Sequence, residues 1–287
     1  MKQLLAPSYT PEEAYMACTS SIVDDQQRER MRRILPSITA NAAEFIERVA
    51  AGSTWEMPYL RSIRGEDPFV IDDIRKSEMV YLYDYYMVKR KPGRALYDSI
   101  LVAAGDHCPT CGGIGQPRTL DHYLPKANYP KLAIVPHNLI PACRDCNTDK
   151  RNPLIDHPHR QPLHPYLDKH LFFEERWISV SVSHTSPCTI TYSASPPDAW
   201  SDEDKARAVN HFVLFGIAER YSIQAGSELS ILMDLRRSYF SRLPPEEFSD
   251  FLRSSANAAS LLINGWKKVL YEALADDVEF CNAELWP

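Results

Sequence analysis

Apolar residues recur at helical spacing through the first part of the chain. Residues 10–51 carry this spacing, and the segment Thr10-Pro11-Glu12-Glu13 has the composition of a helix start, with proline in the first turn and acids near the positive helix end. Pro36 is expected to break the region in two. After residue 71 a further helix is predicted from four apolar positions at helical spacing: Met79, Leu82, Tyr86 and Met87.

Alternating apolar and polar residues from Trp177 to Tyr192 predict two strands in the last part of the chain. The chain is predicted to become helical again after Ser201, which is followed by three acidic residues. A last helical portion is expected over residues 245–274. The pattern therefore predicts a mainly helical chain with one small β-hairpin near its C-terminal end.

The middle of the chain carries two CxxC pairs, which are Cys108 with Cys111 and Cys143 with Cys146. Two such pairs can place four thiolates tetrahedrally around Zn²⁺. The 31 residues between the pairs exceed what a minimal zinc ribbon needs, so a further folded element is expected there. Because four cysteines saturate zinc, this site is predicted to be structural.

The residues between the pairs predict a β-β-α arrangement. Residues 119–123 should form a strand that contains Asp121 and His122, and residues 138–141 a returning strand. A loop over 124–136 would join the strands, and residues 143–152 suit a short helix.

In this segment the sequence resembles the HNH, or ββα-metal, endonuclease family, over about 45 of the 287 residues. The resemblance implies that His122 is the general base, which suits an imidazole that is largely neutral at cellular pH. It implies that Asp121 and Asn147 bind the catalytic metal, that the Asn138 amide pins the loop and orients the histidine, and that Lys150 reaches the phosphate backbone. Neighbouring residues on a strand point to opposite faces, so a local twist or bulge is expected at Asp121 and His122.

The oxygen ligands favour Mg²⁺ or Mn²⁺ as the catalytic ion, beside the structural Zn²⁺. The fold class expected from these patterns is α+β, with an HNH core and zinc knuckle embedded in a mainly α-helical chain. The expected division is a helical N-terminal region over 1–92, an HNH module over 93–165 and a C-terminal region over 166–287.

The net charge of −6 and the pI near 5.9 argue against a protein that coats nucleic acid indiscriminately. Residues 107–160 invert the sign, because seven lysines and arginines face four aspartates, a net of +3. The start of the chain lacks a secretory signal and no long apolar run occurs, so a cytoplasmic protein without membrane contact is expected. Reduced thiols that bind a metal fit that compartment.

Two further surface patterns stay open at this point. Four tyrosines could stack on bases or, as is more usual, pack in the core: Tyr81, Tyr83, Tyr85 and Tyr86. A basic run around Pro92 could contact phosphate or form a solvated turn: Lys89, Arg90, Lys91 and Arg94. The histidines at 157, 159 and 164 match no usual ligand spacing.

The sequence thus favours an HNH endonuclease that cleaves double-stranded DNA, with a role in restriction or antiphage defence by analogy only. A double-strand cut by one active site per chain would favour a homodimer. Two alternatives remain. One is a non-catalytic zinc-knuckle module that binds nucleic acid or protein, and the other is an effector that stays silent until a partner activates it.

Overall fold

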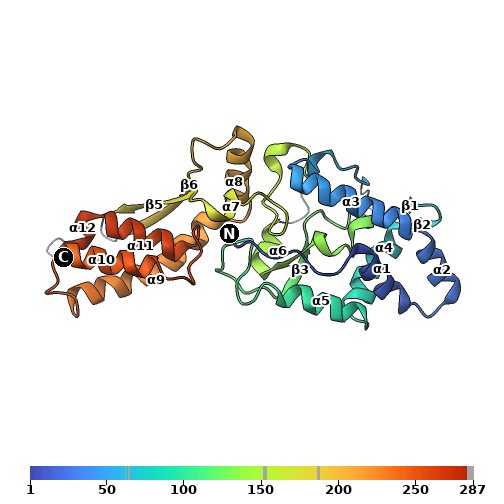
Figure 1. Ribbon diagram of the computed structural model, residues 1–287, viewed down its shortest axis with the longest axis horizontal. Coiled ribbons are helices and arrows are strands. Elements are labelled where there is room, and N and C mark those ends of the chain that lie inside the picture. Colours follow the sequence, from blue (N-terminus) through green and yellow to red (C-terminus); the bar gives the residue numbers. More distant parts are fainter. Residues whose placement is uncertain (62, 64, 151–153, 186–187, 283–287) are drawn as a thin grey trace.

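The N-terminal helices and the C-terminal helices lie at opposite ends of an elongated molecule, with the N-terminus near its middle (Figure 1). The computed structural model describes residues 1–287 except 62, 64, 151–153, 186–187 and 283–287. Helices dominate, and each of the three sheets in the described residues has two antiparallel strands. The expected α+β class is confirmed.

Helix starts in the N-terminal region follow the local sequence signals. Thr10 Oγ1 accepts a hydrogen bond from the Glu13 amide at 3.1 Å, and the Glu13 carboxylate accepts one from the Thr10 amide at 2.8 Å. This reciprocal cap begins the first helix. Pro36 lies in the first turn of the third helix, where its missing N–H costs nothing. The helices here are α1 (Pro11–Ser20), α2 (Asp25–Arg33), α3 (Leu35–Ala51) and the 3-10 turn η1 (Thr54–Glu56).

The segment before the HNH module begins with a small hairpin that the helical spacing did not predict. Its two strands are followed by a helix that widens into a π-helical stretch and then by another helix. The elements are β1 (Phe69–Ile71), β2 (Ile74–Arg75), α4 (Lys76–Tyr81), η2 (Leu82–Met87) and α5 (Gly93–Val102). The apolar spacing identified the helix but not the π-helical geometry of η2, which is uncommon and often marks functional sites.

The predicted β-β-α arrangement is present in the middle of the chain. Strands β3 (Thr119–His122) and β4 (Leu139–Ala142) pair in continuous antiparallel register, with Asp121 opposite Ile140 and His122 opposite Leu139. This register leaves no bulge at Asp121 and His122, so of the two expected distortions the bulge is wrong and the local twist stays a prediction. The loop holds two 3-10 turns, and a helix follows the second strand: η3 (Pro130–Leu132), η4 (Pro136–Asn138) and α6 (Arg144–Lys150). The end of the predicted helix, at 151–152, lies outside the described residues.

The C-terminal region contains the predicted hairpin and a helical bundle. Its elements are η5 (Pro158–Arg160), α7 (Leu171–Glu174), β5 (Ile178–Ser183), β6 (Thr189–Ala194), α8 (Asp202–Leu214), α9 (Ile217–Arg237), α10 (Pro245–Ala256), α11 (Trp266–Asp276) and α12 (Val278–Cys281). The single helical portion expected over 245–274 is two helices. The buried Asn264 lies in the break and its side chain accepts a hydrogen bond from the Trp177 amide at 2.9 Å, which ties the break to the hairpin.

Buried apolar side chains form three groups. One joins the N-terminal helices to α5 and the strands of the HNH module, for example through Met79, Ile100 and Leu139. A second joins α3 to the loop of the module. The third joins the four CxxC cysteines to the C-terminal bundle. The first group contains residues from both sides of the expected boundary at 92/93, and the three-part division stays a prediction.

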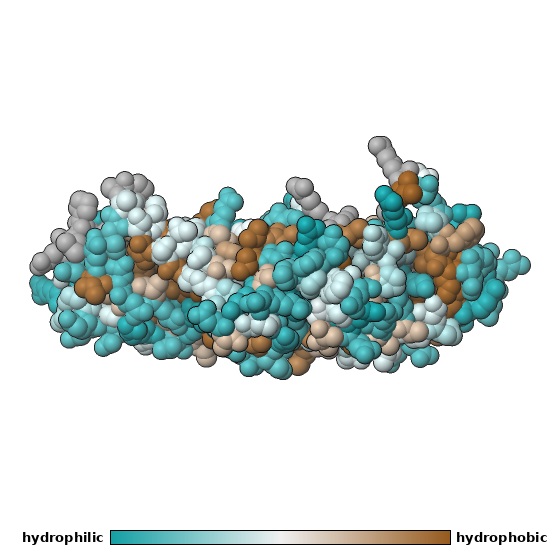
Figure 2. All heavy atoms as spheres, turned by 90° about the horizontal axis from the view of Figure 1, so that it is seen from above, coloured by the Kyte–Doolittle hydropathy of each residue, from teal (hydrophilic) through white to brown (hydrophobic). Residues whose placement is uncertain are grey.

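Hydrophilic residues surround separate apolar patches on the face shown in Figure 2. Among the described residues, no helix combines the length and the apolar character that crossing a membrane requires.

The buried, neutral side chain of His164 should make the stability of the fold depend on pH. The His164 ring donates from Nε2 to the His137 carbonyl at 3.0 Å and accepts at Nδ1 from the Tyr166 amide, while burial lowers its pKa to about 3. Below pH 6.5 the unfolded chain takes up a proton that the folded chain excludes. The contribution of neutral His164 to the free energy of unfolding is therefore complete above pH 6.5 and is lost as the pH falls towards 3.

We expect the free energy of unfolding from urea titrations to fall between pH 7 and pH 5.5, with His164 contributing about 1 kcal/mol of the fall. His164→Gln should lose that share of the pH dependence, whereas His157→Gln, which changes an exposed ring, should keep the wild-type slope. Equal slopes in all three proteins would show that His164 titrates normally in the folded state.

Candidate active site and metal centre

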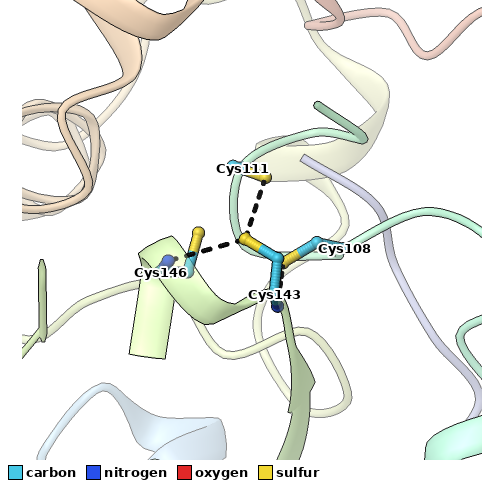
Figure 3. A group of neighbouring side chains, drawn as sticks. All are labelled: Cys108, Cys111, Cys143 and Cys146. Carbon is cyan, nitrogen blue, oxygen red and sulfur yellow. Dashed lines mark hydrogen bonds between the residues drawn. The ribbon is translucent and has the colours of Figure 1, made fainter. Parts of the chain in front are cut away.

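Four cysteine side chains converge at the junction of the HNH module and the C-terminal bundle (Figure 3). Their Sγ atoms all lie within 4.8 Å of one another, and each residue is at most 3% exposed. Four thiolates at about 2.3 Å from a zinc ion lie about 3.8 Å apart, so the cluster needs only a small contraction to hold Zn²⁺. The predicted grouping of Cys108, Cys111, Cys143 and Cys146 is confirmed, and the donor set fits a closed structural site.

Glycines make the first knuckle possible. Gly112 and Gly113 adopt φ values of +64° and +95°, which side-chain-bearing residues rarely tolerate. A Cβ atom at Gly115 would lie 2.5 Å from the Cys143 Sγ. The backbone of this turn therefore has to approach the second CxxC pair closely, which only glycine permits.

Hydrogen bonds already favour the thiolate form in part of the cluster. The thiol of Cys108 lowers the pKa of Cys111 to about 6, and the neighbouring thiols hold the pKa of Cys143 well below its usual range. The Cys143 amide donates to the Cys108 sulfur at 3.4 Å. The same hydrogen bonds raise the pKa of Cys108 and Cys146. Zinc binds thiolates, so its binding would displace the protons that these two cysteines keep.

A positively charged side chain from the C-terminal bundle lies next to the cysteine cluster. Arg220, on α9, donates from Nη1 to the Cys146 sulfur at 3.1 Å and from Nη2 to the Cys143 sulfur at 3.5 Å. Zinc bound by four thiolates carries a net charge of −2, so an adjacent guanidinium offsets part of this charge. No local sequence pattern indicated Arg220, because it lies 74 residues beyond Cys146.

The imidazole of His122 is held in one tautomer at the end of β3. Nε2 lies 2.8 Å from the Ala133 carbonyl oxygen, and because a carbonyl only accepts, Nε2 carries the proton and Nδ1 keeps its lone pair. The ring packs edge-on against Tyr83, with ring centroids 4.3 Å apart. Burial lowers the pKa of His122 to about 3, although the Ala133 carbonyl acts in the opposite direction. The ring is therefore neutral at physiological pH.

Asp121 faces an ammonium group. Lys150 Nζ lies 2.7 Å from Asp121 Oδ2 and also donates to the His122 carbonyl oxygen. Burial raises the pKa of Asp121, and the Lys150 charge opposes that effect. Lys150 is 4% exposed. The family resemblance implied that Lys150 reaches the phosphate backbone, whereas in the structure its ammonium pairs with the partly buried carboxylate of Asp121, which needs a counter-charge.

Asn138 is completely buried and ties together both ends of the loop between the strands. Its Nδ2 donates to the Leu124 carbonyl at 3.0 Å and to the Leu132 carbonyl at 3.1 Å, and its Oδ1 accepts from the Leu124 amide at 2.7 Å. These bonds fix the backbone that precedes Ala133, whose carbonyl holds His122. The amide NH₂ and oxygen of Asn138 are therefore both engaged with the backbone, and the side chain has a structural role rather than one in the reaction.

One cavity of about 340 Å³ brings three of the predicted residues together: Asp121, His122 and Asn147. Asn147 is exposed and reaches the cavity from α6. A carboxylate, an amide oxygen and room for water form a donor set that fits a hard divalent cation. Tyr83 and Lys126 also line the cavity, and the local motif gave no reason to place either there.

Comparison with known proteins relates the chain to a nuclease family and to a phage protein. The HNH endonuclease family matches residues 108–152. Over 296 aligned residues the chain is 32% identical to protein ea31 of Escherichia phage lambda, and the alignment covers 98% of this chain and 99% of that protein. No solved structure matches the chain. The likeness to the phage protein therefore extends through the helical regions on both sides of the HNH segment.

Proposed function

Because the chain belongs to the HNH endonuclease family, and shares its full length with protein ea31 of phage lambda, we propose that it hydrolyses phosphodiester bonds in double-stranded DNA. The observation that supports this best is the single cavity lined by Asp121, His122 and Asn147. A role in restriction or antiphage defence is proposed by analogy alone.

Each residue in and around the cavity would have a distinct role in the hydrolysis. His122 would accept a proton from the attacking water at Nδ1, since the Ala133 carbonyl holds the proton on Nε2. Asp121 and Asn147 would hold Mg²⁺ or Mn²⁺, which supplies charge neutralisation at the phosphate and the departing 3′ oxygen. Asn138 would keep the loop, and through it the histidine, in place. Lys150 would balance the charge of Asp121 rather than contact the substrate.

A non-catalytic zinc module is the second candidate, and one observation favours it. The ammonium of Lys150 already neutralises the carboxylate that would bind the metal. Under this alternative the ion pair is purely structural, and the chain binds nucleic acid or a partner protein without cleaving. A dimer or an activating partner is compatible with either candidate.

The test is incubation of supercoiled plasmid with the purified full-length protein. We expect nicked or linear product with Mg²⁺ and none when divalent ions are omitted. Asn147→Ala should lower the cleavage rate by at least about 10- to 100-fold. Changes to residues that only hydrogen-bond to a metal ligand already reduce metal affinity or activity by that factor, and Asn147 is proposed to be a ligand itself. The exposed Asn147 side chain can be removed without opening the core.

Thr148→Ala is the matched control, since Thr148 is the exposed neighbour on α6 and does not line the cavity. Wild-type protein that retains zinc but leaves plasmid, single-stranded DNA and RNA intact would favour the non-catalytic module. Equal activity of Asn147→Ala and Thr148→Ala would remove Asn147 from the metal site.

A further inference from the structure

Three tyrosine rings contact one another at the end of α4 and in η2. Tyr81 and Tyr85 stack with ring centroids 4.9 Å apart and an interplanar angle of 9°, and Tyr86 meets both edge-on at 5.6 and 5.1 Å. Tyr81 is 47% exposed, and the other two are half-buried. We call these three residues the aromatic strip. A ligand that stacks on aromatic rings would cover the part of this surface that remains exposed.

Three positively charged residues follow the aromatic strip in the sequence. Lys89, Arg90 and Lys91 are exposed and consecutive. The Arg90 guanidinium lies 4.8 Å from the centre of the Tyr85 ring, and its Nε donates to the Tyr85 hydroxyl at 2.7 Å. Within the described part of the chain, none of these three cations forms an ion pair with a carboxylate. The charge of this surface therefore fits a polyanion.

The helical stretch that carries the strip also contributes a residue to the candidate active site. Tyr83, from the same π-helical stretch, lines the cavity and packs against the His122 ring. Lys126 also lines the cavity, lies 4.5 Å from the centre of the Tyr83 ring and pairs with Asp84. A strand whose phosphate lies in the cavity could thus reach the strip through the residues of η2.

The chemistry of the strip selects one form of nucleic acid. In a duplex the base faces are stacked on one another, so exposed tyrosine rings can stack only on unpaired bases. Backbone phosphates of the same strand would meet the adjacent cations. We propose that the aromatic strip with Lys89, Arg90 and Lys91 binds unpaired nucleotides that adjoin the scissile phosphate. This rests on the proposed endonuclease function and narrows its substrate to double-stranded DNA whose bases are unpaired beside the cut, a form that the negative supercoiling of a plasmid favours.

Binding is the test, measured by fluorescence anisotropy with the full-length protein, a labelled 30-nucleotide oligothymidylate and a blunt 30-base-pair duplex, without added Mg²⁺. Tyr81→Ala should weaken oligothymidylate binding by about 5- to 150-fold, the range for loss of one base–aromatic stack. Tyr81→Phe should bind like the wild type, because it keeps the ring. Lys89→Gln should reduce the slope of log affinity against log salt by about 0.7 on the single strand.

Tyr239→Ala is the matched control, since Tyr239 is 81% exposed and lies far along the chain, after α9. The proposal is overturned if Tyr81→Ala binds oligothymidylate as tightly as Tyr239→Ala, or if Tyr81→Ala loses as much affinity for the duplex as for the single strand. The second outcome would assign the surface to duplex DNA. Cleavage is not measured, so failure of the strip and failure of the proposed hydrolysis are distinguishable.

Discussion

His122→Ala is expected to lower the rate of plasmid cleavage by about 10²- to 10⁴-fold, the usual contribution of a positioned general base. The expected loss depends on one ring nitrogen of His122, Nδ1. The Ala133 carbonyl keeps the proton on Nε2, so Nδ1 is the nitrogen that can accept a proton from water. Single-turnover cleavage of supercoiled plasmid at saturating Mg²⁺ measures the effect on the chemical step.

His137→Ala provides the matched control. His137 lies in the same module, is half-buried and does not line the cavity. Both variants should retain zinc and unfold cooperatively, although removal of the buried His122 ring will cost some stability through the space left beside Tyr83. Cleavage by His122→Ala at the rate of His137→Ala would eliminate His122 as the base. Loss of zinc or of cooperative unfolding in His122→Ala alone would mean that the activity loss reports folding.

The parts of the site that could be predicted from the sequence are those whose spacing is local. Each CxxC pair forms one turn, so the spacing alone identified it, and the pairing of β3 with β4 followed from two short strands joined by one loop. Asp121 and His122 are adjacent and Asn147 lies one residue beyond the second pair. A motif of this kind depends little on the rest of the chain.

The contacts that could not be predicted arise from packing between distant segments. Arg220 reaches the cysteines from α9, and Tyr83 reaches His122 from η2. Neither periodicity nor local spacing records which side chain of a distant helix faces a site. The ion pair of Lys150 with Asp121 was missed for a related reason, because the burial of a carboxylate depends on the assembled core and decides where a nearby lysine points.

Helix ends were predicted well where side chains cap the backbone and poorly where tertiary contacts break a helix. The cap at Thr10 is local and began α1 where expected. The interruption between α10 and α11 depends on Asn264, which satisfies backbone groups at Glu175 and Trp177. A polar residue in a helical pattern carries no local sign of such distant partners.

Replacement of Cys146 by serine is expected to abolish tight zinc binding and to destabilise both the HNH module and its contact with the C-terminal bundle. Zinc in a structural site contributes about 10–16 kcal/mol of binding free energy at neutral pH, which exceeds the net stability of most domains. The four cysteines belong to the same buried group as Phe212, Phe215 and Tyr221 of the C-terminal region. Loss of the ion should therefore affect regions on both sides of the junction.

Zinc per chain, measured by mass spectrometry after gel filtration, should be one for the wild type and near zero for Cys146→Ser. The melting temperature of the variant should fall sharply or its transition should lose cooperativity. Cys188→Ser is the control, because Cys188 is half-buried and lies outside the cluster. One zinc per chain with an unchanged melting temperature in Cys146→Ser would contradict a structural four-cysteine site.

The same measurement separates the two metals that the proposed mechanism requires. A closed set of four buried thiolates exchanges its ion slowly and gains nothing from added Mg²⁺, whereas the cavity with Asp121 and Asn147 offers oxygen ligands and open space. Brief treatment with a chelator followed by gel filtration should then remove plasmid cleavage but leave one zinc per chain, and Mg²⁺ alone should restore cleavage. If restoration required Zn²⁺ instead, the cysteine cluster would itself govern activity, and the assignment of a separate oxygen-ligated catalytic ion would fail.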